Sequence, residues 1–250
     1  MSFTCLTPIF AHGRKLPCGK CGNCIRKRSL EWSFRLMQES KAWSSTSFIT
    51  LTYDEENVPC HGVDKEVITK FLKKLRHLCD FKYYLVSEYG PSTLRPHYHA
   101  LFFHDLQPDF FLKHVEQCWQ NGIVTIGDVT QGRVMYCANY HITKTFYPSG
   151  KNENFVHMSK GLGKNWLTDK RLDFFRESGQ MFANHYDGYR VPLPRYYKDK
   201  ILFSPEQVAK NHEFIKKQSL IDNNKSLYKL IKIEEKINKT IKKKLKGRSL

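Results

Sequence analysis

Hydrophobic and polar positions along the chain follow two periods, and each period predicts one type of element. Apolar residues three or four apart predict helices over residues 24–43, 64–79, 108–119 and, beginning at 131, 131–145. Alternating or β-rich runs predict strands over residues 48–53, 82–89, 95–103 and 122–129. From residue 48 the order is strand, helix, strand, strand, helix, strand, helix. That order predicts an α+β protein with a ferredoxin-like split βαβ core, an antiparallel sheet and one sheet face open for a ligand.

Charge narrows the class of partner. The 250 residues include 41 Lys and Arg against 24 Asp and Glu, a formal net charge of +17. Such an excess favours association with nucleic acid or with an acidic membrane surface. The sequence has no apolar run of about 18 residues and no apolar core of a secretory signal. We therefore expect a soluble protein of the cytoplasm.

Four of the eight cysteines lie near the N-terminus. Cys18, Cys21 and Cys24 are each separated by two residues, and the glycines between them let the backbone wrap around one tetrahedral ion. Cys5 is the expected fourth ligand. Without an export signal, reduced thiols that bind a metal are favoured over disulfides. We predict zinc, with an iron–sulfur cluster or no metal as the alternatives.

Basic side chains surround these cysteines. They are Arg14, Lys15, Lys20, Arg26, Lys27 and Arg28. A segment of this kind can bind phosphates, or it can simply fasten the N-terminus to the core.

The segment RPHYHALFF, residues 95–103, carries a second set of metal ligands. Side chains two apart on a strand share a face, so His97 and His99 present two imidazoles to one side of the sheet. Glu88, near the end of the preceding strand, can add a carboxylate to that face. Such a half-open site suits Mg²⁺ or Mn²⁺ and leaves positions free for phosphate oxygens. The alternative is a pair of partly exposed histidines and an exposed carboxylate without an ion.

Tyr136, Tyr140 and Lys144 are each four residues apart on the helix predicted from residue 131. At about 100° per residue they form one stripe along the helix, so two phenols and an ammonium point together. Without a metal nearby such a stripe is a packing surface. Beside a metal site, a tyrosyl oxygen can attack a phosphodiester and Lys144 can offset the charge of the scissile phosphate. Tyr140, nearer to Lys144, is expected to act first.

Four segments together resemble a known family. They are PCGKCGNC at 17–24, FITLTYDE at 48–55, LVSEYGPSTLRPHYHALFF at 85–103 and YCANYHITK at 136–144. In the same order they are similar to segments of HUH endonucleases, and more narrowly of the replication initiators of gokushovirus-like Microviridae, which are small single-stranded DNA phages. One position differs. The family's lysine is expected three residues after the second tyrosine, whereas Lys144 follows Tyr140 by four.

The resemblance implies a metal-dependent endonuclease that starts rolling-circle replication. In this family a histidine pair with a nearby acid holds the ion, and helix tyrosines form a 5′-phosphotyrosyl link to single-stranded origin DNA while freeing a 3′-hydroxyl. A two-tyrosine version, similar to Tyr136 and Tyr140, alternates between nicking and rejoining. Host helicase and polymerase are the implied partners, in the cytoplasm of a host bacterium. A plasmid relaxase or a transposase of the same class, or a non-enzymatic single-stranded DNA-binding or packaging protein, is the alternative.

The remaining segments are less specific. Residues 161–167 resemble a segment of the same initiators, with a plain loop as the alternative. Residues 185–200 interleave rings and cations as single-strand binders do, which also describes an ordinary surface segment. Residues 225–250 hold ten Lys or Arg against two Glu and predict a basic amphipathic helix. DNA is favoured over a membrane surface or another partner for that helix.

We therefore expect four regions along the chain. They are a Cys-rich metal-binding segment with a basic helix over residues 1–44, an HUH endonuclease core over 45–147, an accessory DNA-contacting region over 148–213 and a basic helical tail over 214–250.

Overall fold

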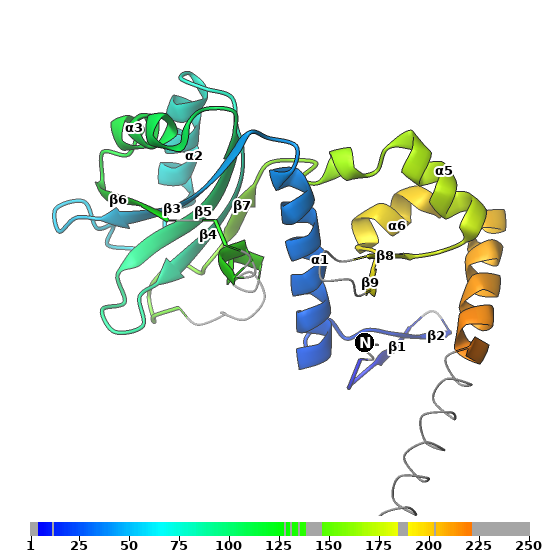
Figure 1. Cartoon of the computed structure of the whole chain (residues 1–250). Helices are drawn as coiled ribbons and strands as arrows, with labels where there is room; N and C mark the ends of the chain where they lie inside the picture. The colour runs from blue at the N-terminus through cyan, green and yellow to red at the C-terminus, as the bar shows by residue number, and fades with distance from the viewer. Residues whose placement is uncertain are drawn as a thin grey trace, which may run out of the picture. The chain divides into compact units, whose positions relative to one another are not determined.

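The chain divides into two compact units, Met1–Leu167 (unit 1) and Thr168–Leu250 (unit 2) (Figure 1). The computed structural model describes residues 5–11, 13–127, 129–130, 132–134, 136–138, 147–184, 190–202 and 204–221. Within these residues no helix is both long enough and apolar enough to cross a membrane.

Unit 1 is built on a five-stranded sheet with the strand order β6-β3-β5-β4-β7, in which every neighbouring pair is antiparallel. Its strands are β3 (Ser45–Tyr53), β4 (Lys82–Tyr89), β5 (Pro96–His104), β6 (Gly122–Gly127) and β7 (Val156–Met158). Two helices join them: α2 (Lys65–Arg76) follows β3, and α3 (Pro108–Cys118) follows β5. The predicted α+β class and antiparallel sheet are confirmed.

The N-terminal part of unit 1 is a small hairpin followed by a long helix. Strands β1 (Ile9–Ala11) and β2 (Arg14–Leu16) pair in antiparallel register. Helix α1 (Gly22–Ser40) begins two residues before the predicted start at residue 24 and ends before Trp43.

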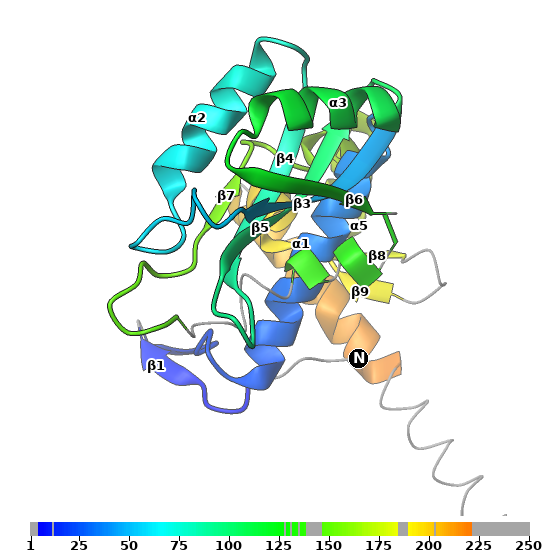
Figure 2. The same cartoon turned by 90° about the vertical axis from the view of Figure 1, so that its left-hand side faces the viewer.

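Strand β5 lies between β3 and β4, and its alternating side chains contribute to two cores. Tyr98 and Phe102 point to the face covered by α2 and α3. Leu101 and Phe103 point to the opposite face, where they share a core with Leu36 of α1. Figures 1 and 2 show α2 and α3 on one side of the sheet and α1 on the other. The expectation of an open second face is therefore wrong for the part that α1 covers.

The segment after β7 is bound to α1. Leu162 is fully buried, and Arg35 donates to its carbonyl oxygen from Nε at 3.1 Å and from Nη2 at 2.9 Å. The buried Glu39 carboxylate accepts from the N–H of Gly163 at 2.6 Å and lies 2.9 Å from Lys82 Nζ. The short helix η1 (Lys164–Trp166) then closes unit 1. Strand β7 itself was not predicted, because three residues are too few to show a period.

Unit 2 is described by its own small set of elements. They are α5 (Asp169–Ser178), β8 (Phe182–Asn184), β9 (Arg190–Pro192), α6 (Arg195–Ile201) and the helical residues 205–221. Gly179 ends α5 with φ of 69°, and a Cβ there would lie 2.7 Å from the Lys210 carbonyl oxygen. The buried Asn211 donates to the Gly179 carbonyl oxygen at 2.7 Å. Glycine at this position lets the 205–221 helix approach α5. The tail predicted over residues 225–250 lies outside the described residues.

The N-terminus of α2 provides a test of local stability. Asp64 is its N-cap, as predicted, and accepts hydrogen bonds from the backbone N–H groups of Glu66 at 2.7 Å and Val67 at 3.2 Å. Asp64→Ala removes that acceptor and should lower the free energy of unfolding by about 1 kcal/mol. Denaturant unfolding followed by circular dichroism measures the change. Asp64→Asn keeps an acceptor oxygen and should lose less, so equal losses in the two variants would contradict a capping role.

Candidate functional site

Glu88, His97 and His99 converge on the sheet face that carries Leu101 and Phe103. The Nε2 atoms of both histidines lie 3.4 Å from Glu88 Oε2. Among the described residues this trio, the acid–histidine cluster, is one of two groups whose ligand atoms all lie within 4.8 Å of one another.

The register of the sheet explains this convergence. Glu88 on β4 and His97 on β5 are direct cross-strand partners, so their side chains project to the same face. His99, two residues further along β5, projects to that face as well. The structure thus brings together the three residues that the sequence pattern singled out.

Hydrogen bonds on the far side of each imidazole decide which nitrogen is available to a ligand. His97 Nδ1 lies 3.2 Å from the backbone carbonyl oxygen of Arg95, which can only accept, so the neutral ring carries its proton on Nδ1. His99 Nδ1 lies 2.9 Å from the Thr50 hydroxyl, which can accept in the same way. Each Nε2 then turns its lone pair toward Glu88. Outer contacts of this type orient imidazole ligands in metal sites.

The geometry and charge of the cluster fit a divalent cation. Glu88 is 3% exposed, and a carboxylate removed from water to this extent is stabilised by a compensating positive charge. Neighbouring ligands of an octahedral ion with bonds of about 2.1 Å lie roughly 3 Å apart. The observed 3.4 Å separations would need only a small inward movement. Three protein ligands would leave further positions for water or phosphate oxygens.

Tyr136 reaches the cluster from outside the sheet. Its hydroxyl donates to Glu88 Oε2 at 2.9 Å, and its ring meets the His99 ring edge-on, with 5.5 Å between the centroids. Burial, together with the hydrogen bond and charge of Glu88, raises the pKa of Tyr136 above that of an ordinary phenol. The phenol is therefore protonated at neutral pH in the absence of a nearby cation.

The core holds the backbone on both sides of Tyr136. Val134, Cys137 and Ala138 are buried in the core that contains α1 and the second sheet face. Tyr140 and Lys144, the other two members of the predicted stripe, lie outside the described residues.

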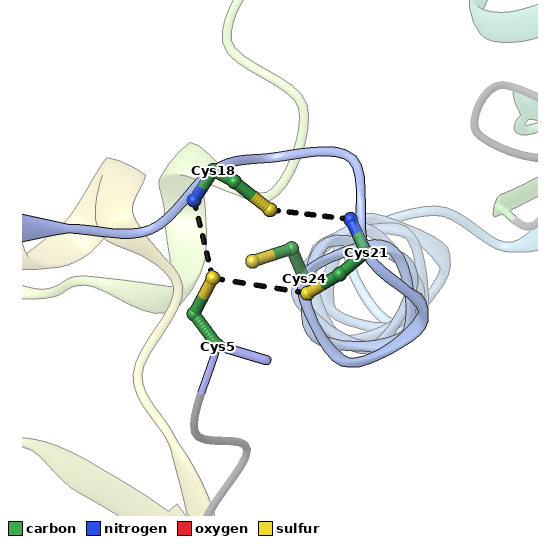
Figure 3. A group of neighbouring side chains, drawn as sticks. All are labelled: Cys5, Cys18, Cys21 and Cys24. Carbon is green, nitrogen blue, oxygen red and sulfur yellow. Dashed lines mark hydrogen bonds between the residues drawn. The ribbon is translucent and has the colours of Figure 1, made fainter. Parts of the chain in front are cut away.

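The second group of ligands is the four-cysteine cluster, Cys5, Cys18, Cys21 and Cys24. Figure 3 shows their side chains gathered around one centre beside α1. The sulfurs of Cys5 and Cys21 lie 3.8 Å apart. A tetrahedral ion with Zn–S bonds of about 2.3 Å would hold its sulfurs about 3.8 Å apart, so the spacing fits zinc. All eight cysteines of the chain are free thiols.

Hydrogen bonds prepare part of this cluster to carry negative charge. Cys18 Sγ accepts from the Thr7 hydroxyl at 3.3 Å and from the N–H groups of Lys20 at 3.4 Å and Cys21 at 3.3 Å. These bonds, with that of Thr7 the strongest, lower the pKa of Cys18 to about 5. Burial raises the pKa of Cys24 to about 12, so this thiol needs a cation to ionise. The donor set fits an ion that binds thiolates.

Comparison with known proteins gives the family. Residues 46–146 match the family of ORF2-type replication-associated proteins. The chain belongs to this family. The part of this ORF2-family protein that matches contains the whole acid–histidine cluster and Tyr136, and it excludes the four-cysteine cluster.

Three relatives of this ORF2-family protein come from viruses. The replication-associated protein ORF2 of Spiroplasma virus 4 is 29% identical over 211 residues, which cover 73% of this chain and 66% of that protein. The replication-associated protein VP4 of Bdellovibrio phage phiMH2K is 27% identical over 212 residues, with the same coverage. The replication-associated protein ORF4 of Chlamydia phage 1 is 27% identical over 211 residues, 74% of this chain and 53% of that protein.

The aligned part of the chain thus spans just under two thirds of the length of the first two relatives and about half of the third. These matches confirm the resemblance to the replication proteins of gokushovirus-like Microviridae. No solved structure matches the chain.

Sequence reasoning missed the residues that support His99 in this ORF2-family protein. Besides the Thr50 contact, the Phe48 ring stacks on the His99 ring with 5.6 Å between centroids. The guanidinium of Arg133 lies 5.3 Å from the Phe48 centroid, and a Cβ on Gly127 would lie 2.4 Å from Arg133 Nη1. The alternation along β3 could have indicated Phe48 and Thr50, because it puts both on the histidine face. The Arg133 contact has no such signal.

Removing one thiol tests the four-cysteine cluster. Cys18→Ser replaces a thiolate ligand with a poorly coordinating hydroxyl, so bound zinc should fall from about one ion per chain to a small fraction of that. Elemental analysis of the purified protein measures the ion. Cys60→Ser changes an exposed thiol outside the cluster and should keep it. An unmodified protein without stoichiometric metal, or a Cys18→Ser variant that retains it, would refute the assignment.

Proposed function

We propose that this ORF2-family protein nicks single-stranded origin DNA and thereby starts rolling-circle replication. The observation that carries the proposal is the 2.9 Å hydrogen bond from the Tyr136 hydroxyl to Glu88, because it sets a nucleophilic side chain beside a cluster fitted for a divalent ion. The replication role named for the relatives and the net charge of +17 support DNA as the substrate. A non-enzymatic DNA-binding protein would account for the charge but not for this convergence.

The topology of the sheet supports an HUH endonuclease fold. Numbered along the chain, β3, β4, β5 and β6 are the first to fourth strands, and they lie side by side in the order fourth, first, third, second. With α2 and α3 in the connections, this is a ferredoxin-like split βαβ arrangement. The acid–histidine cluster lies on its two adjacent strands β4 and β5.

In the proposed reaction, the phenol oxygen of Tyr136 forms a bond to the scissile phosphorus while the bond from phosphorus to the 3′ oxygen breaks. The phenolic proton is lost and the departing 3′ oxygen gains one, so the products are a 5′-phosphotyrosyl link and a free 3′-hydroxyl. Mg²⁺ or Mn²⁺ held by Glu88, His97 and His99 would supply Lewis-acid polarisation of the phosphate. Thr50 keeps the His99 imidazole in position for that ion.

Rejoining the DNA needs a second nucleophile, since the first is still esterified when the new 5′ end forms. We assign the first cut to Tyr136 because of its contact with Glu88, in place of Tyr140, which its proximity to Lys144 favoured. Tyr140 then takes up the new 5′ end, and Lys144 offsets charge on the phosphate.

The other regions receive supporting roles in this proposal. The four-cysteine cluster holds a structural zinc ion. Residues 148–213 and the basic tail over 214–250 add contacts to DNA. Host helicase and polymerase would work from the freed 3′-hydroxyl, in the cytoplasm of the host bacterium.

Removing both imidazoles should separate cleavage from binding. His97→Ala with His99→Ala should lower the rate of cleavage by about 1000-fold or more, because the ion contributes several kcal/mol. Affinity for a single-stranded oligonucleotide should change less than about threefold, because it depends on cations spread over the surface. Gel assays of nicking in added Mg²⁺ or Mn²⁺ and fluorescence anisotropy measure the two. His77→Ala, on an exposed histidine at the end of α2, is the matched control; a double variant that cleaves like this control would rule out the metal assignment.

The two tyrosines can be distinguished by mapping the covalent adduct. Tyr136→Phe should abolish the first adduct with a labelled origin oligonucleotide, whereas Tyr140→Phe should form it but fail in strand transfer. The double variant should form none. Mass analysis of the peptide that carries the phosphate identifies the residue, with Tyr147→Phe as a control on a more exposed phenol that donates to Glu153. A first adduct on Tyr140, or on neither residue, would overturn the order proposed here.

A further inference from the structure

The β1–β2 hairpin displays large apolar side chains on its surface. Leu6, Ile9 and Phe10 are 68%, 53% and 74% exposed. Three such residues within five positions make an apolar patch of a type that marks an interaction surface. No core residue of the described chain comes from this hairpin.

The hairpin depends on the four-cysteine cluster for its position. Each strand has three residues, and an isolated two-stranded hairpin of this size is at best marginally stable in water. Cys5 precedes β1 and Cys18 follows β2, while Cys21 and Cys24 belong to the start of α1. An ion in the cluster would therefore fasten both ends of the hairpin to α1. That arrangement holds the apolar side chains out from the rest of unit 1 as a fixed group.

The charge of the segment indicates which partner would cover this patch. Residues 5–28 contain six Lys or Arg and no Asp or Glu. Phe10 and Lys15 are direct cross-strand partners, so a ring and an ammonium project from the same face about 5 Å apart. Both side chains are exposed. An apolar ring paired with a cation, in surroundings without any acidic residue, is complementary to a base and its flanking phosphate.

We infer that the β1–β2 hairpin is a second single-stranded DNA-binding surface, on which Phe10 stacks against a base and Lys15 contacts a phosphate. The identity of the ligand rests on the proposed function, but the surface is separate from the acid–histidine cluster and lies outside the family match over residues 46–146. The chemistry is sequence-tolerant, because every base offers a flat face. The hairpin thus adds affinity for the strand and does not select the origin.

Fluorescence anisotropy with a labelled single-stranded oligothymidine tests this surface in the full-length chain. Phe10→Ala should weaken binding about 5- to 30-fold, the range expected for one lost base–aromatic stack, without changing the salt dependence. Lys15→Gln should reduce the slope of log K against log salt by about 0.7, the value for one phosphate contact on a single strand. Phe110→Ala and Lys113→Gln, an exposed ring and an exposed cation on α3, are matched controls that should bind like the unmodified chain.

Further variants distinguish base stacking from other causes. Phe10→Trp keeps a flat ring and should bind at least as tightly as the unmodified chain, whereas Phe10→Leu keeps apolar area and should weaken binding as Phe10→Ala does. Zinc content, measured for each variant, should be unchanged. Binding by Phe10→Leu equal to that of the unmodified chain would overturn stacking, and affinities of Phe10→Ala and Lys15→Gln equal to those of the α3 controls would overturn the surface altogether.

The measurement also separates this inference from the proposed function. Binding is measured without added Mg²⁺ or Mn²⁺ and without chelator, so the readout does not depend on cleavage. A chain that binds through the hairpin but never forms a phosphotyrosyl adduct would refute the nicking proposal alone. A chain that forms the adduct but binds DNA independently of Phe10 and Lys15 would refute this inference alone.

Discussion

Successive side chains of a β-strand must point to opposite faces, and unit 1 depends on how β5 uses that constraint. On one face Tyr98 and Phe102 join the core under α2 and α3, and on the other His97 and His99 stand in line with Leu101 and Phe103. Because β5 is paired on both sides, by β3 and by β4, its register cannot shift without moving every residue of both cores. The hydrophobic burial that stabilises the sheet therefore also fixes the positions of the two imidazoles.

The acid–histidine cluster concentrates polar groups where the sheet is otherwise apolar. Glu88 is nearly inaccessible to water, and the groups around its carboxylate are two imidazoles and a phenol. None of these carries a permanent positive charge at neutral pH. A bound cation would therefore be the main compensating charge that this part of the fold can receive, and its arrival would also lower the cost of ionising Tyr136. Substrate chemistry and the stability of the sheet would then depend on the same ion.

Local periodicity was enough to predict much of this structure. The alternation in RPHYHALFF assigned the histidines to one face, and the short connection from Glu88 to His97 implied an antiparallel neighbour, so these ligands could be grouped without coordinates. The N-cap at Asp64 followed from its chemistry. Contacts between distant segments had no such signal. Glu39 and Gly163 are 124 residues apart, and neither residue type indicates that a buried carboxylate accepts from that N–H.

The same limit explains the missed cover of the second face and the missed support of His99. Helical periodicity gave α1 an apolar side through Phe34 and Met37, but it could not say which surface that side would meet. Arg133 lies over Phe48 because Gly127 leaves room for its guanidinium, which depends on how β6 and residues 132–134 approach each other. Such contacts arise from the assembled fold and are not properties of any one segment.

The start of α1 is unusual in the groups that it presents to solvent. Its first turn has no acidic residue and its N-cap, Cys21, makes no side-chain capping hydrogen bond, yet Cys21 and Cys24 place two sulfurs at the positive end of the helix dipole. Thiolates can there take the place that carboxylates have at other helices, but unlike carboxylates they can be oxidised. Oxidation of a pair to a disulfide would remove negative charge from the helix end and the ligands from the ion at once. The order of the N-terminal segment would therefore follow the thiol redox state of its surroundings.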